Sequence, residues 1–172
     1  MLKILIVEDE PELAATLRYL VELNPRYKVT ATAHDLESAM RAADEHPADL
    51  ALVDLQLANS TSGFSVAARL HERGVLCLFT TGQVPSFPLP DLALGCLAKP
   101  FGEAELVFAL TQAEDVLRGR QKIRLRNRCP DKLQLYSTQP QPEPLHPGST
   151  SVAPRPTSLA AKVRRWRSAV QH

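Results

Sequence analysis

Residues 2–11, LKILIVEDEP, decide the fold class of this chain because they join a short apolar run to an acidic turn and a proline. A run of this length, broken only by Lys3 and bounded by turn chemistry, is typical of a buried strand. Proline is well placed in the first turn of a following helix, where its missing N–H has no partner to lose. The stretch therefore predicts a buried strand that leads through acidic residues into a helix.

The alternation of apolar runs and amphipathic segments continues to residue 117. Helical periodicity predicts that the first helix buries Leu13, Leu17, Leu20 and Val21, and Asp35 is expected to cap the second. Five strands alternating with helices predict an α/β fold, a five-stranded parallel sheet that is doubly wound and flavodoxin-like. Residues 83–91 hold three prolines, so the fourth helix should be short or absent. The expected strands cover residues 2–7, 27–33, 50–53, 75–79 and 94–98, and the later helices cover residues 64–73 and about 103–117.

The net charge of +1 conceals an uneven distribution of charge along the chain. Residues 1–117 carry 8 Lys and Arg against 17 Asp and Glu, a net charge of −9, whereas residues 118–172 carry 12 against 2, a net charge of +10. Residues 138–156 hold six prolines and few apolar side chains, a composition typical of disordered linkers. We expect a folded unit over residues 1–118, a Pro-rich basic linker, disordered, over 119–156, and a segment over 157–172 able to form a basic amphipathic helix.

The cysteines and the hydropathy of the chain indicate a reducing compartment. Cys77, Cys96 and Cys129 show no CxxC or metal-ligand spacing, and two of them lie in apolar runs where a thiol acts as a small hydrophobe. No apolar run reaches the roughly 18 residues that a membrane span needs. The sequence therefore predicts a soluble, cytoplasmic protein.

Polar residues suited to chemistry lie where the predicted strands end. Glu8 and Asp9 follow the first strand, Asp54 ends the third, Thr81 follows the fourth and Lys99 follows the fifth. The carboxyl ends of strands form the ligand-binding edge of an open parallel sheet, so we expect these side chains to meet there. Three neighbouring carboxylates repel each other, which either raises their pKa values or demands a cation. Mg²⁺ fits this demand, since it prefers hard oxygen ligands and keeps places for water and phosphate. Asp54 could then act as an anionic nucleophile toward a phosphoryl group, with Lys99 as its counter-charge.

Four motifs at these places resemble one protein family. The stretches ILIVEDE at residues 4–10, LALVDLQL at 50–57, LCLFTTG at 76–82 and LAKPF at 97–101 together resemble the receiver domain of bacterial two-component response regulators, over residues 1–118. The resemblance implies a phosphorylation-dependent switch or phosphate shuttle that accepts phosphate from a histidine kinase or phosphotransfer protein. By matching positions it implies that Asp54 is the phosphoacceptor and that Mg²⁺ is bound by Glu8, Asp9, Asp54 and the backbone carbonyl of Gln56. It also implies that Thr81, or alternatively Thr80, supplies a hydroxyl to the phosphoryl group and that the small Gly82 leaves the phosphoryl site open. Lys99 would be the family's lysine, followed by a cis proline.

The chain departs from the usual receiver pattern at two places. Receivers usually carry Tyr or Phe three residues before the lysine, and here that residue is Cys96, which we interpret as a packing residue. A Pro-rich stretch replaces the usual fourth helix. Both features resemble the subclass of stand-alone receivers whose fourth strand reads Phe-Ala-Thr-Gly, where this chain has Phe79, Thr80, Thr81 and Gly82.

The output of such a switch has more than one explanation. The basic tail, residues 119–172, is too short for a winged-helix domain, so direct DNA binding is not expected. Instead we expect a downstream protein partner, and we expect the tail to contact an acidic surface. Alternatively, the tail binds nucleic acid or an anionic membrane. A further alternative is a phosphatase that forms an aspartyl phosphate, although that class needs an Asp where this chain has Gln56. A flavin-binding module would need phosphate-binding amides in place of the acidic residues 8–12. Beyond self-phosphorylation and autodephosphorylation of Asp54, no enzymatic activity is expected.

Overall fold

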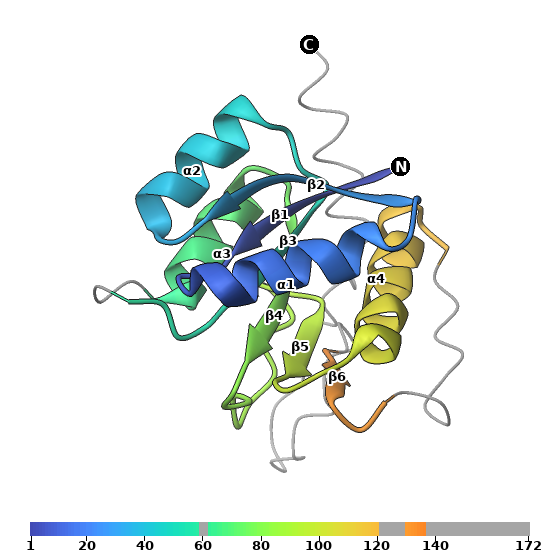
Figure 1. Ribbon diagram of the computed structural model, residues 1–172. Coiled ribbons are helices and arrows are strands. Elements are labelled where there is room, and N and C mark those ends of the chain that lie inside the picture. The colour runs from blue at the N-terminus through green and yellow to red at the C-terminus, as the bar shows by residue number, and fades with distance from the viewer. Residues whose placement is uncertain (59–61, 121–129, 137–172) are drawn as a thin grey trace, which may run out of the picture.

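The computed structural model describes residues 1–58, 62–120 and 130–136, which form a layered α/β unit around one sheet (Figure 1). The six strands have the spatial order β2-β1-β3-β4-β5-β6. The first five are parallel, and β6 pairs antiparallel with β5. The strands are β1 (Leu2–Val7), β2 (Tyr27–Ala33), β3 (Leu50–Asp54), β4 (Leu76–Thr81), β5 (Gly95–Ala98) and β6 (Leu133–Leu135).

Four helices in the described part of the chain cover the two faces of the sheet. Helices α1 (Pro11–Glu22) and α4 (Glu103–Leu117) pack on one face, and α2 (Leu36–Glu45) and α3 (Gly63–Glu72) pack on the other (Figure 1). The predicted doubly wound, flavodoxin-like fold is therefore confirmed. In this fold the carboxyl ends of the parallel strands share one edge of the molecule.

Local chemistry sets the ends of the helices. Pro11 opens α1, and Asp35 caps α2 as predicted, accepting a hydrogen bond from the Ser38 N–H at 2.8 Å. Gly74 and Gly119 follow α3 and α4 with φ angles of 78° and 67°. Only glycine adopts this left-handed conformation without a Cβ penalty, so each glycine stops its helix and turns the chain.

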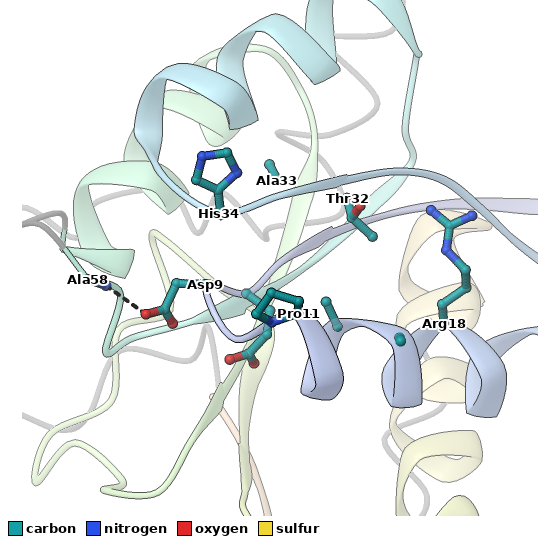
Figure 2. A pocket seen from close by; sticks show the side chains of 10 residues that line it. Asp9, Pro11, Arg18, Thr32, Ala33, His34 and Ala58 are labelled. Carbon is teal, nitrogen blue, oxygen red and sulfur yellow. Dashed lines mark hydrogen bonds between the residues drawn. The ribbon is translucent and has the colours of Figure 1, made fainter.

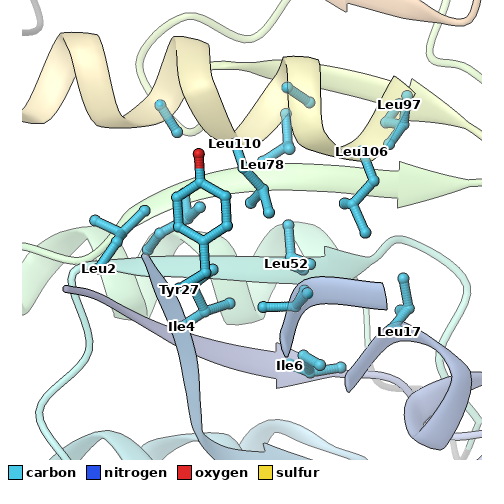
Figure 3. Packing of buried hydrophobic residues seen from close by; sticks show 14 of the residues in the cluster. Leu2, Ile4, Ile6, Leu17, Tyr27, Leu52, Leu78, Leu97, Leu106 and Leu110 are labelled. Carbon is cyan, nitrogen blue, oxygen red and sulfur yellow. The ribbon is translucent and has the colours of Figure 1, made fainter. Parts of the chain in front are cut away.

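Strand side chains alternate between two apolar clusters, one on each face of the sheet. Ile4 and Ile6 of β1 lie in the cluster under α1 and α4, where Figure 3 shows them near Leu52 and Leu17. Leu5, the residue between them, lies in the cluster under α2 and α3. This alternation follows from the two-residue period of a strand, and burial of both faces explains why β1 is almost entirely apolar.

The apolar face of α1 differs by one residue from the expected one. Ala14, Leu17 and Val21 are buried, and Leu20 packs at the edge of the cluster, but Leu13 is 37% exposed. The helix presents the row at positions 14, 17 and 21 to the sheet, which turns Leu13 toward solvent.

The described residues confirm the missing helix and correct the number of strands. Residues 82–94 between β4 and β5 contain no helix. The expected five-stranded sheet has a sixth strand, β6, from within the segment expected to be disordered linker. A strand of three residues carries too little pattern to be seen in sequence, and it forms because β5 offers an unpaired edge. The rest of the expected linker, residues 121–129 and 137–156, and the expected helix over 157–172 lie outside the described residues. In the described part of the chain, no helix has the length and apolarity needed to cross a bilayer.

Candidate functional site

The residues predicted to carry chemistry meet at the carboxyl edge of the sheet. Glu8 directly follows β1, Asp54 is the last residue of β3, and Lys99 directly follows β5. The parallel register aligns Val7 with Val53 and Asp54 with Thr80, so neighbouring strands end at the same level. Strands far apart in sequence thus bring these groups together.

Lys99 joins two of the acidic residues through its ammonium group. Its Nζ donates to Asp54 Oδ2 at 2.6 Å and to Glu8 Oε2 at 2.7 Å. The Glu8 and Asp54 side chains are only 1% and 8% exposed, and that of Lys99 is 20% exposed. The Lys99 N–H donates to the Thr81 carbonyl at 2.8 Å, and the bond between Lys99 and Pro100 is cis, as expected. The predicted partner of Lys99 is therefore confirmed, and Glu8 is a second one.

Burial and charge act in opposite directions on this cluster. Burial raises the pKa of Glu8, although the hydrogen bond and charge of Lys99 oppose that rise. Burial by itself would lower the pKa of Lys99, but the hydrogen bonds and charges of Asp54 and Glu8 together raise it. Lys99 therefore remains a cation, and Glu8 ionises less readily than an exposed glutamate.

Asp9 completes an acidic group with Glu8 and Asp54. One carboxylate oxygen from each of the three lies within 4.8 Å of the others. Asp9 Oδ2 also accepts the Ala58 N–H at 3.0 Å, which fixes its carboxylate against the loop after β3 (Figure 2). Three hard oxygen donors so close together, two of them bonded to Lys99, form a set that fits Mg²⁺.

A groove leads away from this acidic group along α1 and β2. The residues that line it include Glu8, Asp9, Pro11, Arg18 and His34. Figure 2 shows Ala58 and Asp9 on one side of the pocket and Arg18 on the other. Two members of the acidic group, Glu8 and Asp9, therefore border a cavity beside α1 and β2.

Asp54 is held by the backbone that follows it. The Gln56 N–H donates to Asp54 Oδ1 at 2.9 Å, so the carboxylate is fixed from both of its oxygens. Gly63, the first residue of α3, packs against this turn, and a Cβ added there would lie 2.1 Å from the Asp54 carbonyl oxygen. Sequence reasoning did not identify Gly63. The only local signal was a glycine between a polar loop and an amphipathic helix.

The two threonines of β4 occupy different environments. Both lie inside the strand, which extends beyond the predicted end at residue 79. Thr81 Oγ1 accepts the Gln83 N–H and donates to the Gln83 carbonyl, both at 3.2 Å. Thr80 Oγ1 is buried and has no hydrogen-bond partner in the described structure. At Gly82 an added Cβ would meet nothing within 4 Å, so the space beside the site is open. Neither threonine hydroxyl is bonded to Asp54 in this arrangement.

The matches to known proteins fall on the same α/β unit. Residues 4–111 match the family described as response regulator receiver domain. Response regulator GtcR of Aneurinibacillus migulanus is 31% identical over 109 residues, which cover 60% of this chain and 44% of that relative. The chain thus spans less than half the length of GtcR.

Solved structures share the fold. One is a CheY-like response regulator receiver domain protein from Methanospirillum hungatei JF-1, with a TM-score of 0.62 and 21% identity, covering 70% of this chain and 98% of that one. Another is the signal receiver domain of a modulated diguanylate cyclase from Desulfovibrio desulfuricans G20, with a TM-score of 0.55 and 32% identity, covering 64% and 91%.

Proposed function

The chain belongs to the response regulator receiver domain family, and on that premise we propose that it is a phosphorylation-dependent switch that accepts phosphate on Asp54. The observation that carries this proposal is the buried carboxylate of Asp54, bonded to Lys99 beside Glu8 and Asp9. Receiver domains generally act as signalling domains whose partners are histidine kinases or phosphotransfer proteins. We propose that a phosphohistidine of such a partner is the donor here.

In the proposed reaction an oxygen of the Asp54 carboxylate attacks the phosphorus of the donor phosphohistidine. A P–O bond forms and makes an acyl phosphate, while the P–N bond breaks and its electron pair stays on the histidine nitrogen. Lys99 supplies positive charge beside the phosphoryl group as it is transferred to Asp54, because the Lys99 ammonium already lies 2.6 Å from Asp54 Oδ2. The Gln56 N–H keeps the carboxylate oriented during the attack.

The acidic group would hold Mg²⁺ through Glu8, Asp9 and Asp54, with the backbone carbonyl of Gln56 as a further ligand. When bound, the ion supplies charge that offsets the phosphoryl oxygens. Thr81 would exchange its hydrogen bonds with Gln83 for one to a phosphoryl oxygen, and the open space at Gly82 leaves room for that group.

For the output, we propose a phosphate shuttle or a switch read by a partner protein, in the subclass that lacks the switch aromatic. The absence of a helix in residues 82–94 and the presence of Cys96 support this subclass. The basic tail would be an accessory contact to an acidic surface, and direct binding of DNA by a dedicated domain is not proposed. Binding of nucleic acid or an anionic membrane by the tail is the alternative.

A phosphatase that forms an aspartyl phosphate finds less support in the site. That chemistry needs an acid two residues after the nucleophile, and here Gln56 donates its backbone N–H to Asp54 and its side-chain amide to Gln83. Neither group can transfer a proton to a leaving alcohol at neutral pH. Multiple-turnover hydrolysis of phosphoesters by the purified protein would reverse this judgement.

The test is phosphorylation of the full chain by acetyl phosphate with Mg²⁺, followed by intact mass spectrometry. We expect one phosphoryl group on the wild-type protein and none on Asp54→Asn. Asp44→Asn, which changes an exposed carboxylate paired with Arg73, is the matched control and should be labelled normally. An unlabelled wild-type protein, or a labelled Asp54→Asn variant, contradicts the proposal.

A further inference from the structure

Lys132, the residue directly before β6, bonds the two residues that flank Lys99. The Ala98 N–H donates to the Lys132 carbonyl at 2.8 Å, and the Lys132 ammonium donates to the Pro100 carbonyl. One residue outside the five parallel strands therefore holds the backbone immediately before and immediately after the lysine that pairs with Asp54.

We propose that Lys132 is a positioning residue for Lys99, and that the docking of β6 on β5 sets how well Lys99 faces the phosphorylation site. The proposal rests on the proposed function of Asp54. Lys99 reaches Asp54 from a backbone that is anchored on one side by its N–H bond to the Thr81 carbonyl. Lys132 supplies the second anchor, so the position of the Lys99 ammonium depends on a segment that follows α4.

Tyr136 anchors β6 in register at its far end. Its N–H donates to the Leu94 carbonyl at 2.8 Å, and the residue is 6% exposed in the same apolar cluster as Cys96. Burial, together with the neighbouring Cys96, raises the pKa of the Tyr136 hydroxyl to about 12, so the ring stays neutral. A small residue at position 96 leaves room for this ring, which gives the unusual Cys96 a structural reason.

Gly95 permits the close approach of β6 to β5. A Cβ added at Gly95 would lie 2.4 Å from the Gln134 carbonyl oxygen and 3.0 Å from the Leu135 Cα, both backbone atoms of β6. No side-chain rotation relieves contact with backbone atoms. Gly95→Ala is therefore a way to undock the strand without touching Lys132 or the acidic group.

The test compares Lys132→Met with Lys132→Arg in the full chain. Methionine keeps the stem and removes the donor, whereas arginine keeps a cationic donor. We expect Lys132→Met to lower the maximal rate of phosphorylation by acetyl phosphate with Mg²⁺ about three- to tenfold, because the Lys99 ammonium is then held less well beside Asp54. The half-saturating acetyl phosphate concentration should be unchanged, and Lys132→Arg should restore most of the rate. The matched control is Lys28→Met, which removes an exposed lysine of β2.

Hydrogen exchange at the Lys99 amide gives a second readout that needs no phosphate. Exchange should be faster in Lys132→Met and in Gly95→Ala than in the control, because the backbone of residue 99 loses an anchor. Equal rates and equal exchange in Lys132→Met and Lys28→Met would overturn the proposal, as would a Lys132→Arg variant as slow as Lys132→Met. If the wild-type protein takes no phosphate at all, the proposed function fails, while the exchange measurement still decides the positioning role.

Discussion

Replacing Lys99 with methionine tests the electrostatics of the site directly, because the change removes the charge and keeps much of the apolar stem. The ammonium bridges Glu8 and Asp54, whose side chains are 1% and 8% exposed. Without it, two buried carboxylates face each other with no counter-charge. Removal of one partner of a buried ion pair costs about 3–5 kcal/mol. Since the Lys99 side chain is itself 20% exposed, we expect the unfolding free energy to fall by about 3 kcal/mol at neutral pH in the absence of metal.

Two conditions should return part of this stability. In the wild-type protein Lys99 opposes the rise that burial causes in the pKa of Glu8, so its loss raises that pKa further. A carboxyl whose pKa is higher in the folded state binds more protons when folded, so the variant should gain stability as the pH falls through that folded pKa. Mg²⁺ held by Glu8, Asp9 and Asp54 should replace the missing charge, and it should therefore stabilise the variant more than the wild-type protein.

The assay is urea unfolding followed by circular dichroism, with EDTA and then with saturating Mg²⁺. With an m value of about 2 kcal/mol/M, a loss of 3 kcal/mol lowers the midpoint by about 1.5 M. Lys28→Met, the same change at an exposed position of β2, is the control and should leave the midpoint nearly unchanged. A Lys99→Met midpoint in EDTA equal to that of Lys28→Met would refute the reasoning, as would an equal gain from Mg²⁺ in variant and wild-type proteins.

Three further perturbations probe the packing and capping around the site. Gly63→Ala places a Cβ 2.1 Å from the Asp54 carbonyl oxygen and should lower the unfolding free energy, measured in urea, by about 1–3 kcal/mol. A urea midpoint equal to that of the wild-type protein would mean that the turn after Asp54 can shift to accommodate the Cβ. Cys96→Tyr overfills the space beside Tyr136 and should lower the unfolding free energy by about 1–3 kcal/mol. Adding Tyr136→Ala to the Cys96→Tyr protein should recover part of that loss, whereas additive losses in the double-mutant cycle would argue against contact between the two side chains. Hydrogen bonds at the start of α2 lower the pKa of Asp35, so its contribution to stability is present above its unfolded pKa and lost as the pH falls through the folded one. The melting temperatures of wild-type and Asp35→Ala proteins should therefore converge in acid, and a gap that persists there would contradict the role of the charge.

Most of the fold could be predicted because its signals are local. The apolar run at residues 50–53, the proline that opens α1 and the aspartate that caps α2 act over a few residues, where period and capping chemistry are decisive. The exposure of Leu13 could not be predicted, since it depends on which face of α1 meets the sheet. The extension of β4 to Thr81 likewise depends on its pairing with Ala98 of β5, a contact between distant segments.

The groups at the ends of the parallel strands could be read from the amino-acid order, because an apolar run that stops at Glu8, Asp54 or Lys99 must present that residue at the edge of the sheet. Tertiary structure alone decided that Lys99 is shared between Asp54 and Glu8, and that Gly63 supports the turn after Asp54. It also decided that β6 joins the sheet. Three residues have no period to detect, and their hydrogen bonds depend on an edge that β5 offers only once the five parallel strands have assembled.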